Sequence, residues 1–253
     1  MTFKDLYNAL DNRFPKELRC EWDNDGIMCA SDLFRDVEKI LFTLDVTYDA
    51  VRYAIENGFD TIISHHPLIF KPQKSMSNEN YTQKKLIALI KNDVRVMSFH
   101  TRLDAADGGV NDTIANMIEH SKKENDPLDP VGRIITLKNK ASLKDFAETV
   151  KEIFNSPCVL YSGNNDVSKI YILGGDGKDY IENAIIAGAD TLLTGRASYN
   201  TMIDAADMGI NIVEAGHFYT EDPVCKTLEN IIKNMDPDIK TEYFYSNKIS
   251  VLK

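Results

Sequence analysis

Four of the five histidines in this 253-residue chain follow short apolar segments and have acidic residues nearby. They are His65, His66, His100 and His217. Imidazole nitrogen and carboxylate oxygen are donors that divalent ions such as Zn, Mn, Fe, Co and Ni accept together. The pattern therefore predicts a metal centre.

Two adjacent histidines stand in the segment Ser64-His-His-Pro-Leu-Ile-Phe70. Adjacent side chains on an extended strand point to opposite faces, so His65 and His66 serve one site only if the chain turns there or if two ions flank them. Pro67 prevents the strand from continuing. A dinuclear site resolves this geometry. In the alternative interpretation, one imidazole is hydrogen-bonded to a core carbonyl and the other faces solvent.

Two further segments place an acid four residues after a histidine. His100 precedes Asp104, which is followed by Asp107 and a Gly-Gly turn, and His217 precedes Glu221. A carboxylate can bridge two ions, and Asp104 is the first candidate for such a bridge. Alternatively, Asp104 or Asp107 only braces the turn through an Asx hydrogen bond. The spacing of His217 and Glu221 brings them to one face if a helical turn begins there.

The elements that must position these residues recur after 130 residues. Residues 37–40 match residues 167–170, and residues 54–64 match residues 184–194, with Gly, Asp and Thr shared at one offset. Each copy has the pattern of a strand, a helix that ends at glycine, and a second strand. We infer an internal duplication, and we expect the site at the carboxyl ends of the strands.

The polar, proline-containing stretch 119–130 is the expected boundary between two α/β halves. Residues 1–125 carry His65, His66 and Asp104, and residues 126–253 carry His217 and Glu221, with the C-terminal part packing back on the first half. We expect strands at residues 39–44, 61–63, 94–99 and 210–213, and helices at residues 3–13, 48–57 and 111–119. Thr2 is the expected N-cap of the first helix, and His120 is expected to satisfy carbonyls at the end of the third.

The composition is that of an ordinary globular protein, with 43% hydrophobic and 27% charged residues. A net charge of −10 argues against general binding to nucleic acid or to anionic membranes. The N-terminus lacks a secretion signal, and no segment approaches the roughly 18 apolar residues of a membrane span, so we expect a cytoplasmic protein. The four scattered cysteines form no C-x-x-C pair and are expected to be free thiols.

Taken together, the motifs resemble a known family. Four segments are similar, in the same order, to motifs of the GTP cyclohydrolase 1 type 2 homologues, also called interacting-factor-3-like proteins: Glu21-Trp-Asp-Asn-Asp-Gly26, Ser64-His-His-Pro-Leu-Ile-Phe70, His100-Thr-Arg-Leu-Asp104 with Gly108-Gly-Val-Asn-Asp112, and Gly216-His-Phe-Tyr-Thr-Glu221. The resemblance spans residues 3 to 250. It implies an α/β fold of duplicated mixed sheets in two intertwined domains, and a homohexamer built as a trimer of dimers.

The resemblance also implies two divalent ions, whose identity among Zn, Fe, Mn, Co and Ni stays open. Carried over by motif, their ligands are His65, His66, Asp104, His217 and Glu221. His100 falls beside this centre and is the candidate proton-transferring group. Where many members have Thr-Gly-Asp or Thr-Gly-Glu, this chain has Thr194-Gly-Arg196. This makes Arg196 a candidate cation for substrate binding.

Hydrolysis is the activity that the resemblance implies, for example opening of the guanine ring of GTP by a hydroxide that bridges the ions. A metal-dependent nucleotide phosphoesterase is one alternative. A non-catalytic protein for metal-dependent regulation or metal delivery is another. A small anionic or nucleotide-like substrate should be met by cations facing the metals, and Arg102 and Arg196 are the candidates.

Overall fold

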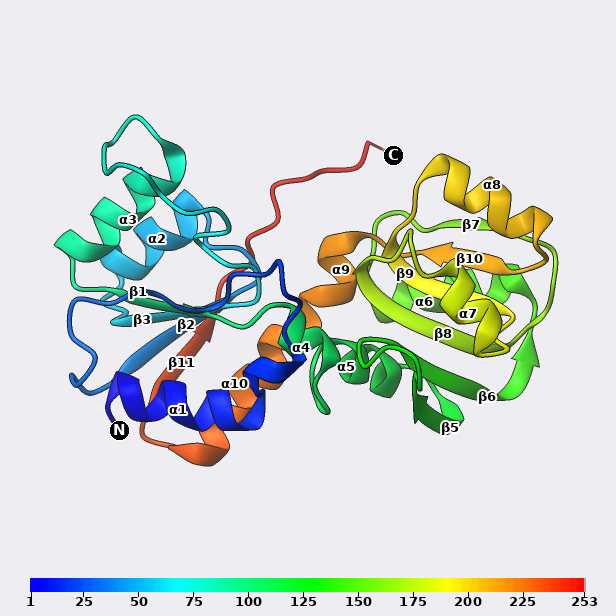
Figure 1. Ribbon diagram of the computed structural model, residues 1–253, viewed down its shortest axis with the longest axis horizontal. Helices are drawn as coiled ribbons and strands as arrows, with labels where there is room; N and C mark the ends of the chain where they lie inside the picture. Colours follow the sequence, from blue (N-terminus) through cyan, green and yellow to red (C-terminus); the bar gives the residue numbers. More distant parts are fainter. Residues whose placement is uncertain (253) are drawn as a thin grey trace. The chain divides into compact units, whose positions relative to one another are not determined.

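The computed structural model of the protein describes residues 1–252, which fold as two compact units (Figure 1). Unit 1 comprises Met1–Leu103 and Val224–Lys248, and unit 2 comprises Asp104–Pro223 and residues 249–252. The chain thus passes from unit 1 into unit 2 and back again, in agreement with the predicted intertwined α/β fold. The sequence placed the boundary after residue 125, whereas the compact units divide within a short helix, α4 (Thr101–Ala105), and next to Pro223.

Unit 1 is built on a five-stranded mixed sheet with the strand order β1-β4-β3-β2-β11. The strands are β1 (Gly26–Cys29), β2 (Lys39–Thr43), β3 (Thr61–Ser64), β4 (Arg95–Ser98) and β11 (Lys240–Tyr243). Only β1 is antiparallel to its neighbour. The helices are α1 (Phe3–Arg13), the short 3₁₀ helix η1 (Lys16–Leu18), α2 (Tyr48–Glu56), α3 (Tyr81–Lys91) and α10 (Pro223–Met235).

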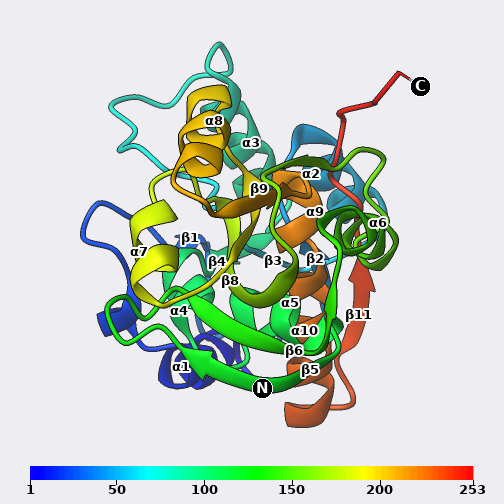
Figure 2. The ribbon, with the colours of Figure 1, turned by 90° about the vertical axis from the view of Figure 1, so that its right-hand side faces the viewer.

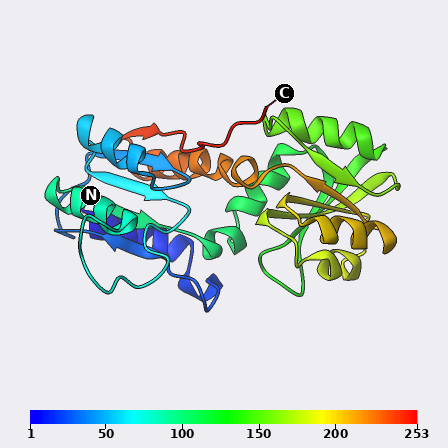
Figure 3. The same ribbon diagram turned by 90° about the horizontal axis from the view of Figure 1, so that it is seen from above.

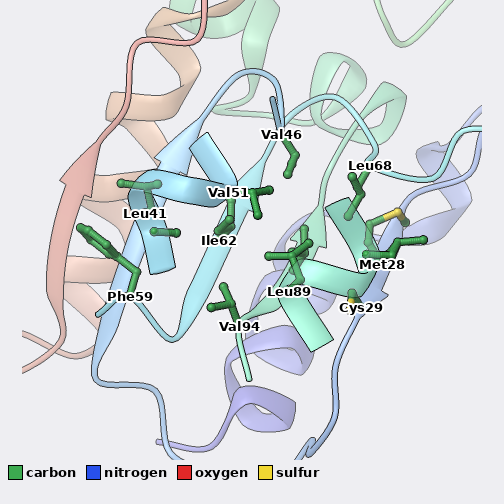
Figure 4. Packing of buried hydrophobic residues seen from close by; sticks show 13 residues of the cluster. Met28, Cys29, Leu41, Val46, Val51, Phe59, Ile62, Leu68, Leu89 and Val94 are labelled. Atoms are coloured by element: carbon green, nitrogen blue, oxygen red, sulfur yellow. The ribbon is translucent and has the colours of Figure 1, made fainter. Parts of the chain in front are cut away.

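Helices cover both faces of the unit 1 sheet, with α2 and α3 on one face and α1 and α10 on the other (Figure 1). The first face buries a hydrophobic cluster in which Leu41 and Ile62 of the strands pack with Val51 of α2 and Leu89 of α3 (Figure 4). Burial on both faces explains why these strands are nearly continuous apolar runs. As predicted, Thr2 caps α1, and it does so through a capping box with Asp5.

Unit 2 is built on a six-stranded mixed sheet with the strand order β5-β6-β8-β9-β10-β7. The strands are β5 (His120–Asn125), β6 (Arg133–Ala141), β7 (Leu160–Ser162), β8 (Val167–Asp176), β9 (Thr191–Arg196) and β10 (Asn211–Glu214). The helices are α5 (Val110–Met117), α6 (Leu143–Ile153), α7 (Ile181–Ile186), α8 (Tyr199–Asp207) and α9 (His217–Glu221). Figures 2 and 3 show α7 and α8 on one face of this sheet and α6 on the other.

The duplication inferred from the sequence is present in the strand register. Strands β2 and β3 run parallel with Ile40 opposite Thr61, and β8 and β9 run parallel with Ile170 opposite Thr191. Both members of each pair are therefore displaced by the same 130 residues. A further parallel strand follows in each copy, β4 beside β3 and β10 beside β9.

The aspartate shared by the two copies fastens the start of the first strand in each. Asp60 accepts a hydrogen bond from the backbone N–H of Lys39 at 2.7 Å, and Asp190 accepts one from the backbone N–H of Lys169 at 2.9 Å. The repeated Asp therefore has a structural reason, because a strand start beside a loop leaves backbone donors that need acceptors.

The polar stretch predicted as a boundary contains an edge strand, β5. His120 begins this strand, and its Nδ1 lies 2.8 Å from the carbonyl oxygen of Ile118, just after α5. Exposed, charged residues along β5 fit an edge that must not pair with other chains. As expected, none of the four cysteines forms a disulfide within the described residues. None of the helices within residues 1–252 combines the length and apolar character needed to cross a membrane.

Candidate metal centre

The carboxyl ends of three neighbouring strands in unit 1 carry the histidines. Asp45 follows β2, His65 and His66 follow β3, and His100 follows β4. A 2.8 Å hydrogen bond between the hydroxyls of Ser64 and Ser98 ties the ends of β3 and β4 together. This is the edge of a parallel sheet where ligand sites are expected.

The three imidazoles form one cluster. The ring centroids lie 5.0 Å apart for His65 and His66, 5.2 Å for His65 and His100, and 5.6 Å for His66 and His100. One nitrogen from each ring lies within 4.8 Å of the others, a spacing that could hold a metal ion. Because the strand ends at Ser64, the chain turns after it and both adjacent histidines serve the same place.

Each of the three rings is fixed through its Nδ1 atom. The nearest oxygen is the Phe99 carbonyl for His65 at 2.9 Å, the Asp45 carboxylate for His66 at 2.7 Å, and the Asp23 carboxylate for His100 at 2.8 Å. A carbonyl oxygen only accepts, so Nδ1 of His65 carries the proton and Nε2 is the basic nitrogen of the neutral ring. Oxygen acceptors on the far side of the ring are typical of metal-binding histidines.

The alternative interpretation of the His-His pair is realised in part, since His65 is hydrogen-bonded to a core carbonyl and is completely buried. This bond uses Nδ1 alone, so it orients the ring for a ligand role through Nε2. The side chain of His66 is 25% exposed.

Asp23 and Asp45 are site residues that we did not predict from the sequence. Asp23 also accepts hydrogen bonds from the backbone N–H and the hydroxyl of Thr101, at 3.0 and 2.6 Å. Burial alone would raise the pKa of Asp23, but the hydrogen bonds from His100 and Thr101 outweigh it and lower the pKa to about 2. Its carboxylate therefore stays ionised. The position of Asp45 directly after a predicted strand was the available signal.

Unit 2 brings its own acidic and histidine donors together. His217 and Glu221 lie one turn apart on α9, with Nε2 and Oε2 separated by 3.0 Å. The predicted helical turn is therefore present. One carboxylate oxygen each of Asp104 and Glu221 lie within 4.8 Å of one another. The side chain of Glu221 is only 6% exposed, whereas that of His217 is 42% exposed.

Two glycines allow α9 to approach the sheet of unit 2. A Cβ atom on Gly175 would lie 2.2 Å from Oε1 of Glu221, and a Cβ atom on Gly195 would lie 2.8 Å from Cα of His217. Gly175 also has a φ angle of +68°, which favours glycine. Both residues stand near the carboxyl ends of strands, β8 and β9. The close approach therefore depends on the absence of these side chains.

The segment that carries Asp104 is held by two buried polar side chains of unit 2. Asn111 donates to the Asp104 carbonyl at 3.2 Å and accepts from the backbone N–H of Gly174 at 2.7 Å. Arg133 donates to the carbonyls of Ala105 and Ala106 at 2.8 and 3.1 Å. These bonds satisfy carbonyls at the end of α4 and fix the backbone next to Asp104. The side chain of Asp107 is 87% exposed.

The sequence model of the family Duf34/NIF3 (NGG1p interacting factor 3) matches residues 1–250 of this chain. The chain belongs to the Duf34/NIF3 family. Among its relatives, a GTP cyclohydrolase 1 type 2 homolog from Clostridium acetobutylicum is 34% identical, covering 92% of this chain and 91% of the relative. A GTP cyclohydrolase 1 type 2 homolog from Clostridium perfringens is 32% identical, covering 95% of each. The crystal structure of a Staphylococcus aureus hypothetical protein is 26% identical and superposes with a TM-score of 0.89, covering 100% of this chain and 99% of that one.

The two arginines considered for anionic substrates have different environments in this Duf34/NIF3 chain. Arg102 is completely buried, and its guanidinium donates to Asp25 at 2.8 Å and to Asp11 at 2.6 Å. It is therefore an internal ion-pair residue of unit 1, and the expectation that it faces a substrate is wrong. Arg196 is exposed at the end of β9.

Proposed function

We propose that this chain is a metal-dependent hydrolase in which His65, His66, Asp104, His217 and Glu221 hold two divalent ions. The observation that carries the proposal is the cluster of three imidazoles in unit 1, each fixed through Nδ1 by an oxygen acceptor. Such anchoring favours the tautomer with the proton on Nδ1, which presents the lone pair of Nε2 to an ion, and it lowers the cost of ordering the rings around that ion. The carboxylates of Asp104 and Glu221 and the imidazole of His217 supply the remaining donors from unit 2.

The donor set of imidazole nitrogens and carboxylate oxygens fits Zn, Fe, Mn, Co or Ni. Ions bound there would supply Lewis acidity and activated water at neutral pH. In our proposal, His100 transfers a proton through Nε2, because Asp23 holds its Nδ1 at 2.8 Å. Arg196 attracts a small anionic or nucleotide-like substrate. The specific reaction that we propose is hydrolytic opening of a purine ring, as in a GTP cyclohydrolase.

A second candidate function is metal binding without turnover, for regulation or metal delivery. The burial of Arg102 favours it, because one of the two cations expected to meet an anionic substrate is occupied within unit 1. Cleavage of a phosphoester would use the same metal-binding residues as ring hydrolysis.

Metal analysis of the purified chain tests the proposal. We expect about two ions per chain after reconstitution with Zn, Mn or Fe, and loss of metal in His66→Ala and His217→Ala. His120→Ala is the matched control, because His120 is the remaining histidine and lies in β5. A chain that binds none of these metals, or variants that bind as much as the wild type, would refute the site.

A hydrolysis screen on the metal-loaded chain separates the candidate reactions. Incubation with GTP would release formate in ring opening, and incubation with GMP would release inorganic phosphate in phosphoester cleavage. The absence of both products, with metal content intact, would favour the non-catalytic function. The same screen on His100→Ala tests the proton-transfer role, since this variant should lose turnover.

We also propose a cytoplasmic homohexamer, a trimer of dimers. Exposed apolar side chains in unit 2, including Ile186, Tyr199 and Met208, and the unpaired edge of β7 are features that self-association would cover. Six copies of the 28.6-kDa chain give about 170 kDa by light scattering. A monomer mass at micromolar concentration would exclude the assembly.

A further inference from the structure

Two large aromatic side chains of unit 1 are exposed beside the histidine cluster. Trp22 is 64% exposed and Phe70 is 46% exposed. Their ring centroids lie 6.1 Å apart with an interplanar angle of 56°. Trp22 is the only tryptophan of the chain, and its exposure shows that it is not a core residue.

Both rings adjoin His100. The centroid of the His100 ring lies 6.1 Å from that of Trp22 and 6.4 Å from that of Phe70, with interplanar angles of 74° and 82°. The His100 ring centroid in turn lies 5.2 Å from that of His65 and 5.6 Å from that of His66. An unbroken series of aromatic rings therefore leads from solvent to the imidazoles that we propose as metal ligands.

The loops that carry these rings are held by polar contacts. Asp23, next to Trp22, has a fully buried side chain that binds His100 and Thr101. Asn24 donates to the carbonyl of Ile69, the residue before Phe70. The two loops are thus joined to each other and to the end of β4.

This arrangement needs an explanation, because burying a large aromatic side chain would stabilise the fold. A contiguous exposed aromatic surface at a candidate site indicates a binding role. Flat aromatic faces bind other planar rings by offset or edge-to-face stacking. They do so with any heteroaromatic ring, since each has a π-face.

We propose that Trp22 and Phe70 form a stacking surface for a planar nitrogen heterocycle in the substrate. This inference rests on the proposed function, because it places the ring within reach of the metal-binding histidines. The face of the heterocycle packs on the indole, and its in-plane nitrogen or oxygen atoms point toward His65, His66 and His100. Phe70 limits how far the ring slides away from His100.

The chain offers a direct measurement, because Trp22 is its only tryptophan and stacking quenches indole fluorescence. The zinc-reconstituted chain is titrated with guanosine and with cytidine, which have planar rings and no phosphate. Ribose, which lacks the ring, is the control ligand. We expect saturable quenching by both nucleosides and none by ribose. No quenching by either nucleoside, or equal quenching by ribose, would overturn the proposal.

Substitutions test whether the rings contribute to affinity. Equilibrium dialysis with labelled guanosine should give about 10- to 100-fold weaker binding for Trp22→Ala, and only a small change for Trp22→Phe, which keeps a stacking face. Phe34→Ala is the matched control, since Phe34 is a 74% exposed aromatic residue elsewhere in unit 1. Unchanged guanosine affinity in Trp22→Ala, in a variant with wild-type thermal stability, would refute the role.

The metal content of the same samples separates this inference from the proposed function. If the chain binds no metal but Trp22 is quenched by nucleosides, the stacking surface stands and the hydrolase proposal fails. If the chain binds metal and nucleosides cause no quenching, the stacking surface fails and the metal centre stands.

Discussion

Asp45 should be the residue outside the ligand set whose loss most weakens metal binding. Its Oδ1 lies 2.7 Å from Nδ1 of His66, and Ser246 donates to its Oδ2 at 3.3 Å. The backbone N–H of Asp45 donates in turn to the Ser246 hydroxyl at 3.2 Å. Asp45 thus fixes the orientation of His66, and the C-terminal segment of unit 1 fixes Asp45.

Removing such a carboxylate typically lowers metal affinity about 10- to 100-fold, or roughly 1.4–2.7 kcal/mol. The side chain of Asp45 is 43% exposed, so water replaces part of the lost interaction and the lower end applies. We therefore expect Asp45→Ala to weaken zinc binding about 10-fold. Asp45→Asn should lose less, because its amide oxygen can still accept from Nδ1 of His66.

A competition titration of zinc against a chromophoric chelator measures this effect, with thermal denaturation as a check on folding. Asp49→Ala is the matched control, because Asp49 is equally exposed on α2 but forms ion pairs with Lys248 and Arg52. Ser246→Ala should fall between the control and Asp45→Ala. Zinc affinity of Asp45→Ala within twofold of the wild type would refute the positioning role.

Three further predictions concern Gly175, which allows α9 to pack against the sheet, and two buried charged residues. Gly175→Ala should displace the Glu221 carboxylate, since the new Cβ would lie 2.2 Å from Oε1, and the metal content should fall while the fold persists. Glu229 is buried, which alone would raise its pKa, but hydrogen bonds from two lysines and a threonine lower the pKa to about 2. The ionised Glu229 should stabilise the fold by about 1–3 kcal/mol above about pH 4.5, and this contribution should decline as the pH falls toward 2. The unfolding free energy of Glu229→Gln, measured in urea, should therefore change less with pH in this range than that of the wild type. Arg102→Met should cost about 3–5 kcal/mol in unfolding free energy, because it removes the buried guanidinium from the Asp25 carboxylate and leaves only the partly exposed Arg19 as its ion-pair partner, at 3.6 Å. Adding Asp25→Asn should recover part of this loss.

Periodicity predicted much of the fold, because strands buried on both faces and helices with one apolar face have distinct patterns. The helix at Phe3–Arg13, the strand at Lys39–Thr43 and the turn at His217–Glu221 all lie where the sequence placed them. The sequence predicted that the C-terminal part packs back on the first half, but it did not predict which strands pair there. Strand β11 pairs with β2, a contact between residues about 200 positions apart that no local pattern encodes.

Candidate site residues of a rare type could be named from the sequence, whereas those of a common type could not. Histidines near strand ends are conspicuous, whereas Asp23 is one of many acids and lies 77 positions from the ring that it fixes. Arg102 was misread for the same reason, since one charged residue in a sequence gives no sign of whether acids far along the chain enclose it. Three-dimensional contacts decide this, and they bring Asp11 and Asp25 to its guanidinium.

The duplication explains why the two units contribute different kinds of donors. With the shared register of 130 residues, Asp45 corresponds to Gly175, and His65 corresponds to Gly195. In unit 1 these strand-end positions carry a ligand candidate and the acid beside it. In unit 2 both are glycine.

Each glycine leaves space that α9 fills. The candidate ligands His217 and Glu221 of unit 2 therefore lie on the helix that packs against the strand ends, and not on the strand ends themselves. The third strand-end position differs from these two, because it is not covered by α9. His66 corresponds there to Arg196, whose side chain is exposed. Restoring a histidine with Gly195→His should therefore fail to create a ligand, because its Cβ would lie 2.8 Å from Cα of His217 and 2.4 Å from the Thr220 hydroxyl. We expect this variant to lose metal and thermal stability together. A stable Gly195→His variant with wild-type metal content would show that α9 does not need the close approach.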